Sequence, residues 1–145
     1  MSQLPYVPEG REILYVEEGN RFMMAAKKAA EELSSDHAHP TGSVLVCGDE
    51  IVSRGANVSD YHEKHGCRRK ELGVPTGQQY EVCEGCNPRN HAEQNALSEM
   101  QQYCKNTDLY LWGHWWCCES CWGKMIEAGI RNVYLVEGAE EKFKR

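Results

Sequence analysis

The sequence predicts a three-layer α/β/α sandwich, in which helices cover both faces of a mixed β-sheet. Helical and strand patterns follow one another in the order helix, strand, strand, helix, strand, helix, strand. A short turn separates the first two strands, which indicates an antiparallel pair. A helix separates the last two strands, and such a crossover places strands parallel in one sheet. This element order favours a mixed sheet with helices on both faces.

The first half of the chain predicts one helix and one β-hairpin. Residues 21–33, RFMMAAKKAAEEL, have apolar residues at helical spacing among strong helix formers. Residues 42–48 are an apolar run typical of a buried strand, and residues 51–58 form its partner after the turn at 48–50. The helix is expected to face the core with Phe22, Met23, Ala26, Ala30 and Leu33.

Two stretches show no regular spacing of apolar residues. Residues 1–17 contain three turn-forming Pro and Gly residues, although Ile13, Tyr15 and Val16 suit a short extended arm of open role. Residues 59–90 are too many for an idle loop in a compact domain. We therefore expect this second stretch to carry function or an additional constraint.

The second half of the chain predicts two more helices and two more strands. These elements span residues 91–103 (helix), 108–112 (strand), 118–128 (helix, ended by Gly129) and 130–137 (strand). The charged tail that follows suits a short helix or a disordered end. At 145 residues, the whole chain (1–145) is expected to form a single domain.

Composition narrows the class of protein and of partner. The chain is 26% charged and 41% hydrophobic, with a formal net charge of -6. No apolar run is long enough for a membrane span, and the N-terminus lacks a signal pattern, so we expect a cytoplasmic protein without a membrane partner. Polynucleotide binders depend on Lys and Arg to neutralise phosphates, so the negative charge argues against a nucleic-acid partner. Eight cysteines without a secretion signal are expected to be metal ligands and free thiols.

Two short motifs predict a catalytic zinc site. His91, Cys118 and Cys121 supply three ligands, which is the number in catalytic zinc sites that keep a fourth position for water. Glu93 is expected to stand beside that position without binding the metal and to move a proton as general acid and base. His91 and Glu93 are two residues apart, about 200° on a helix, so His91 must lie at the irregular start, which Asn90 would cap.

The cysteine pair leaves one alternative open. Cys117 and Cys121 are four residues apart and also share a helix face. We prefer Cys118, because it keeps a two-residue gap to Cys121, and we expect Cys117 to line the pocket or support the ligands.

At these residues the chain resembles the cytidine and deoxycytidylate deaminase superfamily, and most of all its deoxycytidylate (dCMP) deaminases. The family signature is His-x-Glu followed by Pro-Cys-x-x-Cys, with Cys117 here in the place of the proline. The segment from Cys67 to Cys83 resembles an insertion carried by many dCMP deaminases, and residues 55–58 match two of four positions in the family's Gly-Tyr-Asn-Gly. The resemblance covers about residues 20–137, with 59–90 as the insertion.

The resemblance implies a cytidine deaminase-like fold and a zinc-dependent hydrolase that converts dCMP to dUMP. In the implied reaction, zinc-bound hydroxide adds to C4 of cytosine, Glu93 carries the proton to N3 and then to the amine, and ammonia leaves. The resemblance also implies a homo-oligomer. Substrate contacts are expected from Asn57, Ala92, His114 and Trp116, whose indole is suited to stack on the base.

A second, structural zinc is a further hypothesis. Cys67, Cys83 and Cys86 lie in the 59–90 stretch with histidines nearby, which is the composition of a closed zinc site. His65 is the fourth ligand of choice, and His62 and His37 remain alternatives.

Two other functions remain open from the sequence. One is a deaminase of another nucleoside or nucleobase, or of adenosine in transfer RNA. The other is a zinc-stabilised module without turnover, which the missing proline at Cys117 makes worth testing.

Overall fold

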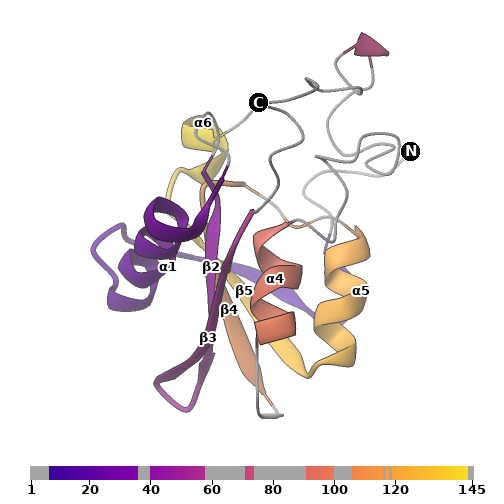
Figure 1. Ribbon diagram of the computed structural model, residues 1–145. Helices are drawn as coiled ribbons and strands as arrows, with labels where there is room; N and C mark the ends of the chain where they lie inside the picture. Colours follow the sequence, from indigo (N-terminus) through magenta and orange to yellow (C-terminus); the bar gives the residue numbers. More distant parts are fainter. Residues whose placement is uncertain are drawn as a thin grey trace.

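The computed structural model contains a five-stranded sheet with helices on both faces (Figure 1). It describes residues 7–35, 40–57, 71–73, 91–99, 106–115, 117 and 119–143. The strands are β1 (Glu12–Val16), β2 (Gly42–Cys47), β3 (Glu50–Ala56), β4 (Thr107–Trp112) and β5 (Ile130–Val136). The helices named here are α1 (Arg21–Leu33), α4 (Ala92–Glu99), α5 (Glu119–Glu127) and α6 (Ala139–Phe143). The predicted α/β/α sandwich with a mixed sheet is confirmed.

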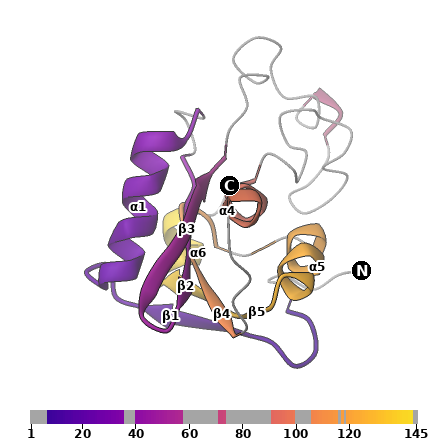
Figure 2. The same cartoon turned by 60° about the horizontal axis from the view of Figure 1, so that its bottom comes forward.

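The sheet has the strand order β1-β5-β4-β2-β3. β2 runs antiparallel to β3 and β4, whereas β5 runs parallel to β4 and β1. Both expected pairings, the hairpin and the parallel pair joined by α5, are present. Figure 2 shows α1 on one face of the sheet and α4 with α5 on the other. α6 shares the face of α1, since Phe143 packs 5.0 Å from the ring of Trp112 and Lys27 lies 5.1 Å from the same ring.

β1 is a full strand of the sheet, where the sequence predicts only an extended arm. It pairs with β5 along its whole length, from Glu12 opposite Asn132 to Val16 opposite Val136. Its side chains do not form a buried row, and Tyr15 is 52% exposed. Main-chain pairing with a strand more than a hundred residues away defines β1, and such pairing leaves little trace in the local pattern.

The helix α1 packs closely on the sheet through small side chains. The side-chain oxygen of Asn20 caps it by accepting hydrogen bonds from the amides of Phe22 and Met23, at 3.0 and 3.1 Å. The buried residues of the helix are Met23, Ala26, Ala29 and Ala30. Leu33 was expected in this row but is 40% exposed, because the helix ends there and Ser34 is extended.

Replacing Gly42 by alanine is expected to destabilise the fold by about 2–4 kcal/mol, because overpacked backbones must separate. A Cβ at Gly42 would lie 2.3 Å from the carbonyl oxygen of Ala26 and 2.4 Å from the amide nitrogen of Ala30. For a chain of this size the midpoint of thermal unfolding should fall by roughly 10 °C, which circular dichroism would measure.

The matched control is Gly123→Ala on α5, where a Cβ would meet nothing within 4 Å. Alanine favours a helix over glycine, so this variant should be at least as stable as the wild type. An unchanged midpoint for Gly42→Ala would contradict the close packing of α1 on β2.

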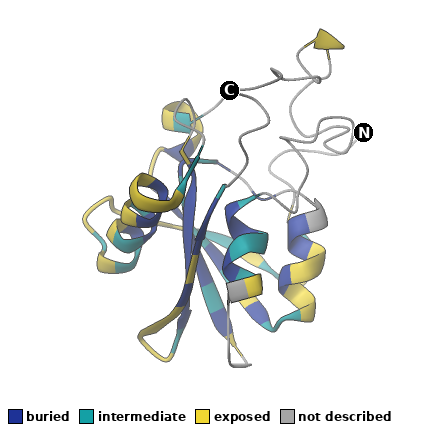
Figure 3. Ribbon diagram, in the orientation of Figure 1, coloured by how far each residue is buried: buried dark blue, intermediate teal, exposed yellow. Residues whose placement is uncertain are grey.

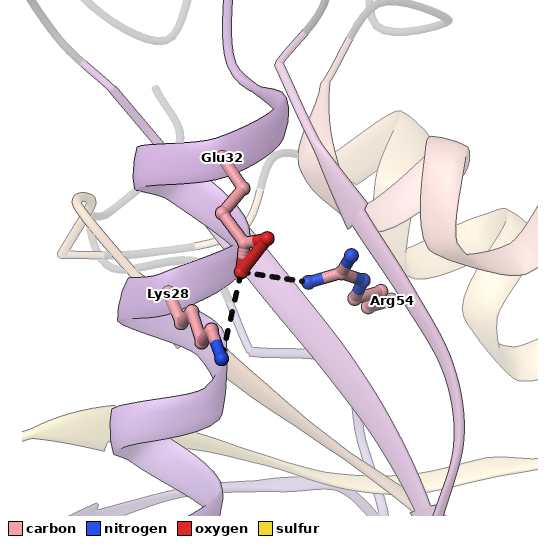
Figure 4. A network of polar contacts seen from close by, with 3 residues as sticks. All are labelled: Lys28, Glu32 and Arg54. Carbon is pink, nitrogen blue, oxygen red and sulfur yellow. Dashed lines mark hydrogen bonds and ion pairs between the residues drawn. The ribbon is translucent and has the colours of Figure 1, made fainter.

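Apolar burial, rather than surface charge, holds the layers together. Figure 3 shows buried residues concentrated in the sheet and on the inner sides of the helices. A surface ion-pair group joins α1 to β3, with Glu32 at 3.4 Å from Arg54 and 3.8 Å from Lys28 (Figure 4). These side chains are 43–72% exposed, and pairs of this kind contribute about 0–1 kcal/mol.

One cysteine departs from the expectation of metal ligands and free thiols. Cys47, at the end of β2, is disulfide-bonded. Cys117 and Cys121 are not in disulfide bonds, so its partner lies outside the described residues. Within the described ranges, no helix has the length and hydropathy that a bilayer crossing requires.

Candidate metal centre

Three residues with metal-binding side chains meet between α4 and α5. A ligand atom from each of His91, Glu93 and Cys121 lies within 4.8 Å of the other two. The closest pair is Nδ1 of His91 and Sγ of Cys121, which are 3.5 Å apart. Cys121 is fully buried and Glu93 is 4% exposed, so the group forms an enclosed polar centre.

The start of α4 explains how His91 and Glu93 face one point. The helix begins at Ala92, and the carbonyl of His91 accepts a hydrogen bond from the amide of Asn95 at 3.1 Å. His91 therefore occupies the N-cap position, where the backbone is not helical. The 200° separation that a regular helix would impose between His91 and Glu93 therefore does not apply. Glu93 follows in the first turn of α4, where the positive end of the helix dipole stabilises a carboxylate. Asn90, expected to be the cap, lies outside the described residues.

Cys121 lies in the first turn of α5, where the free amides and the helix dipole favour thiolate over thiol. The side-chain amide of Gln94 on α4 also donates a hydrogen bond to its sulfur, at 3.7 Å. Sequence reasoning did not single out Gln94. Its position three residues after His91, on the same side of the helix, is the signal that could have found it.

The donor set fits zinc. Zinc binds imidazole nitrogen at about 2.0–2.1 Å and thiolate sulfur at about 2.3 Å, and tetrahedral geometry then places the two donors about 3.5 Å apart. Nδ1 of His91 and Sγ of Cys121 have this separation. A buried carboxylate beside two such ligands, as Glu93 is here, suits proton transfer at the metal's remaining position.

Cys117 lies apart from the three residues that meet at the candidate site. Cys117 is fully buried and not in a disulfide bond, but it does not belong to the group formed by His91, Glu93 and Cys121. This placement gives no support to Cys117 as a ligand. Cys118 lies outside the described residues and stays a prediction.

Hydrogen bonds from the sheet hold α4 in place. The hydroxyl of Ser43 on β2 donates to the carbonyl of Ala92 at 2.9 Å, and that of Ser53 on β3 donates to the carbonyl of Ala96 at 2.5 Å. The side-chain amide of Asn95 donates to the carbonyl of Ala56 at 2.6 Å. A Cβ at Gly55 would lie 2.3 Å from the amide nitrogen of Ala96, so only glycine permits this approach.

Asn57, which is expected to contact the substrate, follows β3 and makes hydrogen bonds to neighbouring segments of the protein. Its side-chain oxygen accepts hydrogen bonds from the hydroxyl of Ser34 and, at 3.0 Å, from the amide of Thr41. Its main-chain carbonyl also accepts from the amide of Ser35 at 3.2 Å. These bonds connect the end of α1 to the beginning of β2, and a substrate role for Asn57 stays a prediction.

His114 and the tryptophans follow β4. The amide of Trp115 donates to Nδ1 of His114 at 2.9 Å, so a bond donated by this imidazole to a substrate would come from Nε2. Trp115 is 6% exposed and packs in the core. Ala92 is fully buried in the same core, and its contact with substrate stays a prediction.

The remaining predicted site residues lie outside the described part of the chain. They are Trp116 for base stacking, and Cys67, Cys83, Cys86 and His65, with His62 and His37 as alternatives, for a second zinc. Their roles stay predictions.

Comparisons with known proteins show the family of this chain. Residues 16–137 match the family model of the cytidine and deoxycytidylate deaminase zinc-binding region. No curated protein matches the chain.

Solved structures of similar fold include two of a dCMP deaminase from the cyanophage S-TIM5. The apo form superposes with a TM-score of 0.52 at 20% identity, over 86% of this chain and 87% of that one. The complex with dCMP and dUMP superposes with a TM-score of 0.50 at 21% identity, over 79% of this chain and 77% of that one. At these identities the likeness shows a shared fold.

Proposed function

The chain belongs to the cytidine and deoxycytidylate deaminase family, and from this membership we propose that it is a hydrolytic deaminase that converts the cytosine of a nucleotide, dCMP, to uracil. One observation carries the proposal. His91, Glu93 and Cys121 converge within 4.8 Å, with the histidine nitrogen and the cysteine sulfur at the 3.5 Å separation of zinc ligands.

We assign the metal ligands to His91 through Nδ1, Cys121 and Cys118. When bound, zinc lowers the pKa of a coordinated water so that the water can react near neutral pH. The amide of Gln94 supports the thiolate of Cys121 by hydrogen bonding. Two thiolates and one neutral imidazole balance the charge of the metal, so a separate base must take the proton of the water.

Glu93 is the base and the acid of the proposed reaction. Its carboxylate accepts a proton as water oxygen bonds to C4 of the cytosine ring and delivers that proton to N3. It then takes the proton of the new C4 hydroxyl and passes it to the C4 amine as the C4 carbonyl forms. The C4–N bond breaks and ammonia leaves with its electron pair, so cytosine and water become uracil and ammonia. Burial of Glu93 keeps bulk water from competing for these protons.

The net charge and one protein of similar fold support the choice of substrate class. A net charge of -6 does not favour a polynucleotide, whose phosphates need many basic partners. One protein of similar fold is a dCMP deaminase bound to dCMP and dUMP. These observations make dCMP the first substrate to test.

The experiment is ammonia release by the zinc-loaded chain on dCMP, dCTP, cytidine and guanine. We expect the highest kcat/KM with dCMP and a stoichiometric uracil product, which chromatography would identify. A gel-shift assay with RNA at physiological salt should show no complex.

Two outcomes would contradict the proposal in different ways. If the protein released ammonia only from a substrate other than dCMP, it would still be a deaminase, but the proposed substrate would be wrong. Zinc-loaded protein that releases ammonia from none of these substrates would instead indicate a zinc-stabilised module without catalysis.

A further inference from the structure

Ser43 makes a buried hydrogen bond next to the candidate site. It lies near the start of β2, an inner strand of the sheet, where its main chain pairs with Gly55 on β3 and Leu111 on β4. Its side chain is fully buried and donates from Oγ to the carbonyl oxygen of Ala92 at 2.9 Å. The bond therefore joins the sheet to the beginning of α4.

The acceptor has a special position in the chain. The carbonyl of Ala92 and the amide nitrogen of Glu93 belong to one rigid peptide unit. The hydrogen bond from Ser43 to the Ala92 carbonyl therefore fixes the plane of the Ala92–Glu93 peptide, to which the Cα atom of Glu93 is attached. His91 precedes Ala92 directly, at a position where no regular helical backbone constrains it.

We propose that Ser43 is a positioning residue that fixes the Ala92–Glu93 peptide and thereby sets His91 and Glu93 in register with Cys121. The expected effect on kcat rests on the proposed function, whereas the expected effect on zinc affinity rests only on the metal centre. A displacement of about 1 Å at a reacting group can cost 10²-fold in rate. A buried hydroxyl with a single well-placed acceptor is suited to prevent such a displacement.

The same helix contains a matched bond that does not touch the site. Ser53, 9% exposed, donates to the carbonyl of Ala96 at 2.5 Å. Both bonds run from a serine hydroxyl on the sheet to a carbonyl of α4, one helical turn apart. Loss of either should destabilise the fold similarly, whereas only the Ser43 bond holds the peptide between His91 and Glu93.

The test compares Ser43→Ala with Ser53→Ala in the full chain. Zinc affinity is measured by competition with a chromophoric chelator, and kcat and KM for dCMP are measured at saturating zinc. We expect Ser43→Ala to lower zinc affinity and kcat by about 10-fold each with little change in KM, as supporting residues of metal sites do. Ser53→Ala should match the wild type in both while losing similar thermal stability.

Ser43→Thr keeps the hydroxyl and separates hydrogen bonding from packing. It should retain zinc affinity within about threefold of the wild type, even where the extra methyl lowers thermal stability. Equal zinc affinity and kcat in Ser43→Ala and Ser53→Ala would overturn the proposal, as would a loss in Ser43→Thr as large as in Ser43→Ala. Should the wild type deaminate no nucleotide, the proposed function fails, and the zinc affinities still decide the role of Ser43.

Discussion

Replacing Glu93 by glutamine is expected to lower kcat for dCMP by about 10²- to 10⁴-fold while zinc stays bound, because the amide cannot accept the proton of the attacking water. Glutamine has nearly the size of glutamate, so the buried position, 4% exposed in the wild type, stays filled. Ammonia release would give kcat, and elemental analysis would give the zinc content. The loss corresponds to about 3–5 kcal/mol of transition-state stabilisation.

The control for this variant is Glu127→Gln. Glu127 is an exposed carboxylate at the end of α5, and the substitution changes the net charge by the same unit. Its kcat should equal that of the wild type. If Glu93→Gln retained more than a few per cent of wild-type turnover, Glu93 would not be the proton carrier.

Replacing Cys121 by serine is expected to remove both zinc and turnover. The sulfur of Cys121 lies 3.5 Å from Nδ1 of His91, at the separation expected of two zinc ligands. A serine hydroxyl is a far weaker zinc ligand than a thiolate at neutral pH. Zinc affinity should fall by at least about 100-fold, and deamination should drop to the background rate. Chelator competition and ammonia release would measure the two effects on the same preparation.

Cys117→Ser is the matched control, because Cys117 is also a fully buried cysteine outside any disulfide bond. It lies outside the group formed with His91 and Glu93, so this variant should keep its zinc. The reverse result, with zinc lost from Cys117→Ser and kept by Cys121→Ser, would favour the rival ligand assignment.

Local pattern was sufficient for most elements of the fold. The helical spacing in residues 21–33 and the apolar run that begins at Gly42 predict α1 and β2 with their observed starts. β1 could not be predicted as a sheet strand in the same way. Its residues are half-buried or exposed, and its pairing with β5 joins segments more than a hundred residues apart.

Some residues of the candidate site could likewise be predicted from the sequence, and others could not. The residue types at His91, Glu93 and Cys121 indicate zinc chemistry because few other combinations of imidazole, thiolate and carboxylate have this spacing. Gln94 and Ser43 were not found, since a glutamine on a helix and a serine in a strand are ordinary residues until their partners are known.

The sequence by itself determined the kinds of side chain available for chemistry and the order of helices and strands, because both depend on residue identity and short spacing. Only the tertiary structure decided which atoms meet. The 3.5 Å approach of His91 to Cys121 joins residues 30 apart in the chain, and the bond from Ser43 to Ala92 joins residues 49 apart. Their geometry depends on how α4 and α5 pack on the sheet, and packing between distant segments is not encoded in any short stretch of the chain.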